Sequence, residues 1–180
     1  MSDYMLIDLS NVLSEPHKSI DETVACTLDA FSGPYGAYPV TSKSNVHVTV
    51  RYIGDRQLEV GAECDLALEI PCDRCLEPVT TDFEIRCLQK VKLSESEEDA
   101  ESDEFDEANY IQGYTLDVDK LICNEVIVGW PAKILCSEDC KGICHVCGQN
   151  LNKGTCDCED TGLDPRMSVI RDVFKNFKEV

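Results

Sequence analysis

The amino-acid sequence predicts an α+β fold: a mainly antiparallel β-sheet with two helices and a C-terminal cysteine-rich zinc-knuckle module. Segments such as 46–52 and 83–87 alternate apolar and polar residues, which is the pattern of half-buried strands. Two later segments, 118–129 and 164–178, carry apolar residues at helical spacing. Six of the twelve cysteines lie between these two segments, within residues 136–158.

The N-terminal part of the chain gives the weakest strand signal. A short strand is expected within residues 2–12, where a few apolar residues alternate with polar ones. Residues 13–44 show a mixed pattern, and the Gly- and Pro-rich stretch 32–39 predicts a loop or turn. Clear alternation begins at 46–52, and the residues at 53–56 predict the turn that ends this strand.

The next strands are expected to form a hairpin that ends in a C-x2-C loop. The chain returns through a strand at 58–60, and residues 63–70 alternate again with Cys, Leu and Ile facing inward. A further strand includes 83–87. Cys72 and Cys75 lie between these strands, so the sequence places both thiols at or near the tip of the hairpin.

Both predicted helices begin at an aspartate. Asp117 is in the N-cap position of the helix at 118–129, which Gly129-Trp130-Pro131 ends. Asp164-Pro165 has the residues favoured at a helix start, and the helix is expected to run to about Lys178. This second helix contains Arg166 and is the one locally basic element of the chain.

The length of 180 residues suits one domain with a metal-organised module. We expect residues 1–135 to form the antiparallel sheet domain, and 136–180 to form the cysteine-rich module and C-terminal helix. The sheet domain would include the helix at 118–129 and a loop at 94–107 that holds nine acidic residues and no basic residue. Charges of one sign at that density repel one another, so this loop is expected to be exposed.

The net charge of −19 constrains the possible partners. Proteins that bind duplex DNA neutralise phosphates with Lys and Arg, so this charge disfavours DNA as a partner and favours basic proteins. The first residues have no basic segment, and no apolar run approaches about 18 residues, so we expect neither a signal peptide nor a membrane span. The sequence thus predicts a soluble, cytoplasmic protein, in which clustered thiols stay reduced and favour metal over disulfides.

Eight cysteines have the spacing of metal ligands, enough for two four-cysteine Zn²⁺ sites: Cys72, Cys75, Cys136, Cys140, Cys144, Cys147, Cys156 and Cys158. The favoured division joins the hairpin pair to the first two cysteines of the module and leaves the last four as a local second site. A crossed arrangement, with the hairpin pair joined to Cys144 and Cys147, is the alternative that spacing leaves open. Neither arrangement has an open position for water, so both predict structural zinc.

The remaining cysteines are expected to fill the core, because free cysteine is among the residues most often buried; they are Cys26, Cys64, Cys87 and Cys123. No Ser-His-Asp, Cys-His or phosphate-binding glycine pattern is present in the sequence. Redox catalysis by Cys72 and Cys75 is disfavoured, because their loop follows a strand and because Asp73 would raise the thiol pKa. We therefore expect a protein that is not an enzyme.

These residues resemble the YceD family, the bacterial and plastid large ribosomal RNA subunit accumulation proteins. The similarity covers about residues 60–170. Its elements are Cys72-Asp-Arg74-Cys75 and the acidic region after the hairpin, Gly142-Ile-Cys144-His-Val-Cys147-Gly148, Leu151-Asn152, Cys156-Asp-Cys158 and Asp164-Pro165-Arg166. Other members often have Pro at the position of His145, a departure that leaves the cysteines intact.

The resemblance implies a non-enzymatic role in making or retaining the 23S ribosomal RNA during large-subunit assembly. The family's gene commonly neighbours that of a small basic zinc protein of the large subunit. With the negative charge, this suggests that the chain holds a basic ribosomal protein or a large-subunit precursor, and affects 23S RNA indirectly. Arg74 and Arg166 are candidate binding residues; for Arg74, an ion pair with the acidic surroundings is the alternative role. Direct RNA binding is the alternative function, and thiol redox activity is the less favoured one.

Overall fold

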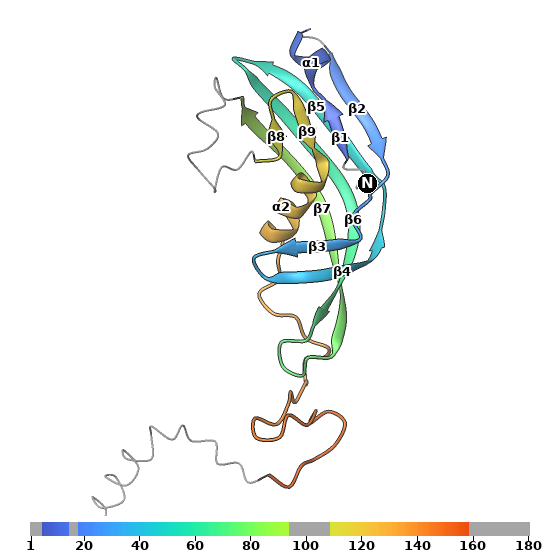
Figure 1. The fold of residues 1–180 in the computed structure, drawn as a ribbon, viewed down its shortest axis with the longest axis vertical. Helices are drawn as coiled ribbons and strands as arrows, with labels where there is room; N and C mark the ends of the chain where they lie inside the picture. The colour runs from blue at the N-terminus through green and yellow to red at the C-terminus, as the bar shows by residue number, and fades with distance from the viewer. Residues whose placement is uncertain (1–4, 15–17, 94–108, 159–180) are drawn as a thin grey trace, which may run out of the picture.

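The computed structural model describes residues 5–14, 18–93 and 109–158, which form an elongated molecule with the cysteine-rich segment at one end (Figure 1). The elements in chain order are β1 (Leu6–Asp8), α1 (Ser10–Ser14), β2 (Ser19–Val24), β3 (Ala30–Gly33), β4 (Gly36–Lys43), β5 (Val46–Gly54), β6 (Gln57–Pro71), β7 (Pro78–Lys92), β8 (Ile111–Gln112), β9 (Thr115–Asp117) and α2 (Val118–Val128). All strand pairs are antiparallel. The expected acidic loop at 94–107, and the C-terminal helix with Arg166, lie outside the described residues.

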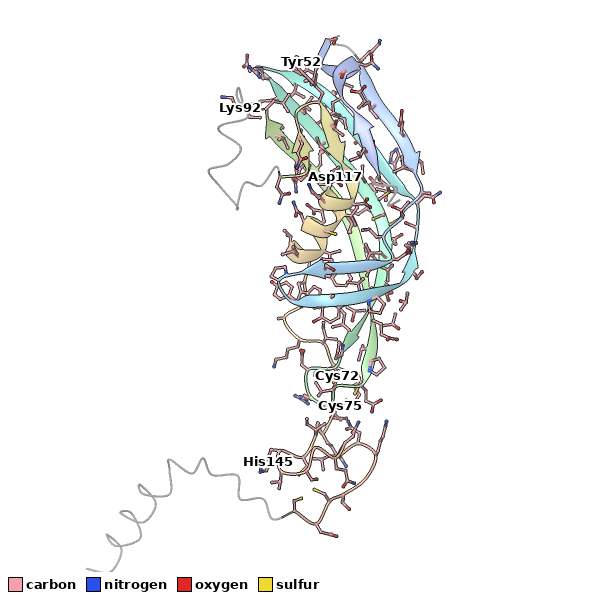
Figure 2. The ribbon with its side chains drawn as sticks, viewed as in Figure 1. Tyr52, Cys72, Cys75, Lys92, Asp117 and His145 are labelled. Atoms are coloured by element: carbon pink, nitrogen blue, oxygen red, sulfur yellow. The ribbon has the colours of Figure 1, made fainter. Side chains whose placement is uncertain are left out.

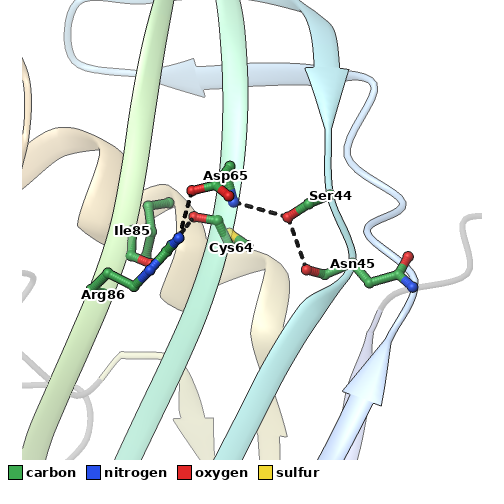
Figure 3. Close-up of polar contacts among 6 residues, drawn as sticks. All are labelled: Ser44, Asn45, Cys64, Asp65, Ile85 and Arg86. Atoms are coloured by element: carbon green, nitrogen blue, oxygen red, sulfur yellow. Dashed lines mark hydrogen bonds and ion pairs between the residues drawn. The ribbon is translucent and has the colours of Figure 1, made fainter.

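Strand β6 is the centre of the six-stranded sheet. Strand β7 pairs with it from Pro71↔Pro78 to Gln57↔Lys92 with no register shift. On its other edge β5 pairs with the first half of β6 and β4 with the second half, while β2 and β3 extend the sheet outward. Ser44 joins the two pairings, because its amide donates to the Asp65 carbonyl and its hydroxyl accepts from the Asp65 amide (Figure 3).

One face of this sheet is buried and the other is open. The even-numbered side chains of β5 and β6 and several odd-numbered side chains of β7 face the core, as the alternating burial of the strands shows. A three-stranded sheet of order β1-β9-β8 contributes Ile7 and Leu116 to the same core, and α2 contributes Leu121, Ile122 and Val126. The period-2 pattern therefore correctly predicted a mainly antiparallel sheet and the inward-facing positions of its strands.

Helix α2 confirms the expected start at Asp117, whose side chain accepts a hydrogen bond from the Lys120 amide at 3.1 Å. The helix ends at Val128, and the Gly129 amide donates back to Glu125. Trp130 follows and packs among aromatic side chains, which are Phe31, Tyr35, Tyr38 and Phe83. These contacts attach the β3–β4 hairpin to the end of α2.

Three local expectations need correction. The stretches at 58–60 and 63–70 form one continuous strand, β6, because the inward positions keep the same phase throughout. The Gly- and Pro-rich stretch 32–39 is mostly strand, since β3 and β4 run into it from both sides and Gly33 pairs with Gly36. Helix α1 was not predicted; it is a short helix whose Val12 is buried.

No helix in the described ranges is long and apolar enough to cross a membrane.

Candidate metal centres

The β6–β7 hairpin presents Cys72 and Cys75 at its tip, facing the cysteine-rich segment (Figure 2). The Cys72 carbonyl accepts the Leu76 amide at 2.9 Å, and Leu76 has a positive φ of 62°. This conformation turns the backbone sharply, so both thiols point to the same side of the loop. Leu76 is nevertheless 64% exposed, so burial does little to offset the strain of its left-handed backbone.

The second C-x2-C loop has the same backbone turn. The Cys144 carbonyl accepts the Gly148 amide at 2.8 Å, and Gly148 has a φ of 75°. Gly148 therefore turns the backbone of the second loop at the position that Leu76 occupies in the first loop. Glycine adopts this conformation without steric cost. The two loops are thus related in geometry although they lie far apart in the sequence.

The first sulfur group consists of Cys72, Cys75, Cys136 and Cys140, whose Sγ atoms all lie within 4.8 Å of one another. Two of the distances are Cys72–Cys140 at 3.8 Å and Cys75–Cys136 at 3.5 Å. A tetrahedral Zn²⁺ with Zn–S bonds of about 2.3 Å would separate its sulfurs by about 3.8 Å. These distances fit a shared metal ion and are far longer than a disulfide bond of about 2.05 Å.

The second sulfur group consists of Cys144, Cys147, Cys156 and Cys158, again with all Sγ atoms within 4.8 Å. It is the more accessible of the two. Cys144 is buried, but Cys147 is exposed and the last two cysteines are half-buried, whereas the first group has three buried members. The structure therefore groups the sulfurs as in the favoured division, and it separates the pairs that the crossed arrangement would join.

Backbone amides lower the pKa of one thiol in each sulfur group. Burial opposes the Cys72 thiolate, but backbone amides of Arg74, Cys75 and Cys136 donate to it and lower its pKa to about 6. Backbone amides of Cys147 and Val146 likewise lower the pKa of Cys144 to about 6.

Other thiols shift the opposite way. At Cys75 the Glu77 amide favours the thiolate, but burial and the neighbouring thiols outweigh it and raise the pKa to about 12. At Cys158 the neighbouring Cys147 and burial also raise the pKa to about 12. Four thiolates in so small a volume need a cation to offset their repulsion, and a divalent metal supplies that charge.

Arg74 holds the first sulfur group in place. Its guanidinium donates to the carbonyl oxygens of Cys140 at 2.9 Å and Glu138 at 3.3 Å. Its own carbonyl accepts the Ile143 amide, and Gly142 passes so close that a Cβ there would lie 3.0 Å from this oxygen. The side chain thus bonds backbone carbonyls, and among the described residues it forms no ion pair with an acidic side chain. Its role in binding a partner stays a prediction.

Further contacts that the sequence did not point to join the hairpin tip to the module. Asp73 Oδ2 accepts the Ile134 amide at 2.7 Å. The Glu77 carboxylate accepts from Asn150 at 3.1 Å and from the Lys153 ammonium at 2.6 Å. Asn152 donates to the Cys140 sulfur at 3.2 Å. Polar residues directly beside the cysteines were the available signal for these contacts, but their partners are 61 to 76 residues away for Asp73 and Glu77.

The four other cysteines lie away from both sulfur groups. Cys64 is buried, and Cys26, Cys87 and Cys123 are half-buried against the main core. Burial raises the pKa of Cys64 to about 12, which keeps it a neutral thiol. This agrees with the prediction that these residues fill the core.

The comparisons with known proteins add one finding. The family described as "Large ribosomal RNA subunit accumulation protein YceD" matches residues 60–174, which include most of the β6–β7 hairpin and all eight cysteines of the two sulfur groups. No curated protein and no solved structure gives a match to this sequence. Since the match spans more than half of the chain, this protein belongs to the YceD family.

Proposed function

We propose that this protein is a non-enzymatic assembly factor of the large ribosomal subunit that supports the accumulation of 23S ribosomal RNA. The observation that carries the proposal is the family match over residues 60–174, since the family's description names the accumulation of large-subunit ribosomal RNA. The protein would act in the cytoplasm by binding a basic ribosomal protein or an assembly intermediate, so that its effect on the RNA is indirect.

The charge of the chain supports a basic partner. Its net charge is −19, and two four-thiolate zinc sites would each add further negative charge. A field of this sign attracts basic proteins and repels the phosphate backbone of RNA at long range. Direct RNA binding is therefore the second candidate; Arg74, its best single contact, already donates to two backbone carbonyls.

Both sulfur groups are proposed to bind structural Zn²⁺. Four cysteines converge in each group, which fits a closed tetrahedral site and leaves no ligand position for a reacting water. Bound zinc would fix the segment 136–158 against the hairpin tip, because the first group takes ligands from both parts. The result is a rigid surface for a partner. This arrangement also disfavours disulfide exchange, which needs two thiols free to react.

A binding experiment separates the candidate functions. The zinc-loaded full chain is titrated with purified basic ribosomal proteins of the large subunit and with 23S RNA fragments, each at low and high salt. We expect salt-sensitive binding of at least one basic protein and no shift of the RNA. Binding of RNA alone, with affinity falling steeply as salt rises, would replace this proposal by direct RNA recognition.

An exchange assay tests the redox alternative. The reduced chain is mixed with a test disulfide, and its Cys72→Ser variant serves as the matched control. We expect no reduction by either protein beyond the background rate of free thiols. Rapid reduction that disappears in the variant would support a thiol oxidoreductase instead.

A further inference from the structure

Among the described residues, strand β7 has one free edge along its whole length. It pairs with β6 through 15 consecutive residue pairs, and no other described strand pairs with it. The Cys72 amide bonds the Glu77 carbonyl at one end of the hairpin, and the Leu93 amide bonds the Arg56 carbonyl at the other. Hydrogen-bonded positions alternate in an antiparallel ladder, so odd-numbered residues of β7 face β6 with their backbone groups, and even-numbered residues face outward from the edge.

This edge lacks two features that usually prevent pairing with another strand, proline and bulges, although it carries charged side chains. Between Val79 and Lys92 it contains no proline, and its register with β6 has no bulge. All its even-numbered side chains are exposed, and Leu88 in their midst is 67% exposed. A long, regular edge with an exposed leucine is suited to the addition of another strand.

The charges along the edge identify the occupant. Asp82 and Glu84 lie toward one end, and Lys90 and Lys92 lie toward the other, at the end of the sheet far from the cysteines (Figure 2). Arg86 between them is already bound, since its guanidinium contacts Asp65 at 2.8 Å and the carbonyls of Cys64 and Ile85 (Figure 3). A basic strand would be repelled by the two lysines, and an acidic strand would be repelled by the two acidic residues. An antiparallel copy of β7 instead places opposite charges next to each other at both ends.

We infer that two copies of this chain associate through antiparallel pairing of their β7 edges, with Cys87 opposite Cys87 at the two-fold axis. In this register Asp82 lies opposite Lys92 and Glu84 opposite Lys90, and each pair occurs twice by symmetry. Arg86 lies opposite Leu88, so the aliphatic stem of the arginine covers the exposed leucine. The two six-stranded sheets become one continuous sheet.

The register is specified because its neighbours place like charges together. Moving one strand by two residues in one direction sets Arg86 opposite Arg86. Moving it by two in the other direction sets Arg86 opposite Lys90. Like charges directly opposite each other destabilise a strand pair, whereas opposite charges contribute roughly 0.2–1 kcal/mol per pair. Shifts by one residue would put outward backbone groups opposite inward ones and break the ladder.

The inner side of the edge has space for the second copy. A groove of about 220 Å³ lies between residues 82–86 of β7 and the C-terminal end of α2, with Glu125 and Val128 along its wall. Val128 is 80% exposed there. In the inferred register, Val91 of the second copy lies opposite Phe83, on the side of this groove. The interface thus covers apolar surface on both faces of the joined sheet.

A charge-swap experiment tests this inference, using sedimentation or light scattering on the full chain. The wild type is expected to form a dimer of twice 20.1 kDa. The variants Asp82→Lys/Glu84→Lys and Lys90→Glu/Lys92→Glu should each raise the dimer dissociation constant at least about tenfold, because all four facing pairs become like-charged. Mixing the two variants should restore association as a heterodimer.

The control and the register are checked separately. Glu22→Lys/Glu138→Lys makes the same charge change as the first variant at exposed positions off β7 and should stay dimeric. A zero-length carbodiimide should join Glu84 to Lys90, which lie six residues apart on one strand, about 20 Å, and can be linked only between chains. A monomeric wild type, charge-swap variants that self-associate as strongly as the wild type, or a wild-type dimer that does not cross-link Glu84 to Lys90 would overturn the inference.

Discussion

At the scale of single residues, backbone conformation at the module depends on two glycines with nearly equal φ. Gly142 has a φ of 77° and Gly148 a φ of 75°, a region that residues with a side chain rarely adopt. Their surroundings differ. A Cβ at Gly142 would lie 3.0 Å from the Arg74 carbonyl oxygen, while a Cβ at Gly148 would have nothing within 4 Å. Substitutions at these two positions therefore distinguish the cost of backbone strain from the cost of steric contact.

Gly142→Ala is expected to destabilise the module more than Gly148→Ala. Both variants bear the cost of a left-handed alanine, about 1–2 kcal/mol. Gly142→Ala must also displace the Arg74 carbonyl, which accepts the Ile143 amide at 3.1 Å, so its loss should be larger by about 1 kcal/mol. Hydrogen exchange of residues 140–151 in the zinc-loaded protein measures both. Equal losses would show that close approach to Arg74 imposes no constraint.

A second residue-scale feature is the half-buried carboxylate of Asp119. Its Oδ2 accepts the Met5 amide at 3.1 Å, and its Oδ1 is buried and has no hydrogen-bond partner among the described residues. Burial raises its pKa above the ordinary 3.8, against the Met5 hydrogen bond, and the neighbouring Asp117 raises it further. The folded state therefore holds this proton at a pH where the unfolded chain has released it.

This shift predicts a pH dependence of stability. As pH rises from below 3.8 through the raised pKa, the folded state binds more protons than the unfolded state, so the contribution of Asp119 to stability falls. Asp119→Asn removes this titration and keeps an oxygen that can accept the Met5 amide. We expect the variant to be at least as stable as the wild type at pH 7 and to lose less stability over that range. Denaturant unfolding at several pH values measures this; parallel curves would contradict it.

At the scale of elements, the segment 136–158 and the antiparallel sheet differ in what stabilises them. Strands β5, β6 and β7 bury a continuous set of apolar side chains. The segment 136–158 has few buried apolar residues, and its fixed points are the sulfur groups and the hydrogen bonds to the hairpin tip. Structural metal binding supplies folding free energy to such a segment, so its order should depend on the ligands.

Cys147→Ser is expected to unfold the module while the sheet persists. Loss of one thiolate from the second group removes most of the affinity for its metal and thus most of the free energy that orders the segment. Limited proteolysis should then cut within residues 142–158 and leave β6 and β7 intact. Cys26→Ser is the matched control, since Cys26 lies outside both groups, and its cleavage pattern should equal that of the wild type. Resistance of the Cys147→Ser module to cleavage would refute this prediction.

At the scale of the whole molecule, the first sulfur group connects the tip of the β6–β7 hairpin to the segment 136–158, and the second group lies within that segment alone. The first group is mostly buried at the hairpin tip, with Cys72 fully covered. The second is open to solvent at Cys147. If both bind zinc as proposed, the two ions should differ in their rate of release although their ligand sets are the same.

Protein purified under reducing conditions is expected to contain about two zinc ions per chain by elemental analysis. A chelator should remove them in two phases, the fast one from the exposed second group. Cys147→Ser should contain one zinc ion and lose the fast phase. If the purified protein contains no zinc and all its thiols are free, the proposal that the sulfur groups bind zinc is wrong.

Local patterns were enough to predict much of this protein. Alternation at 46–52 gave the buried face of β5, because neighbouring side chains in a strand point to opposite faces. Asp117 marked the start of α2, because capping depends on residues within one turn. The cysteine spacing predicted two groups of four, since ligands from one loop must lie a few residues apart.

The division of the cysteines was decided only by the tertiary structure. Spacing identifies pairs such as Cys72 with Cys75, but which pair of the module meets them depends on how residues 131–140 cross the hairpin tip. The contacts that fix this crossing, Asp73 with Ile134 and Arg74 with Cys140, join residues more than 60 positions apart. The free edge of β7 is likewise a property of the sheet order. A strand's pattern records which face is buried but contains no information about which edge has a neighbour.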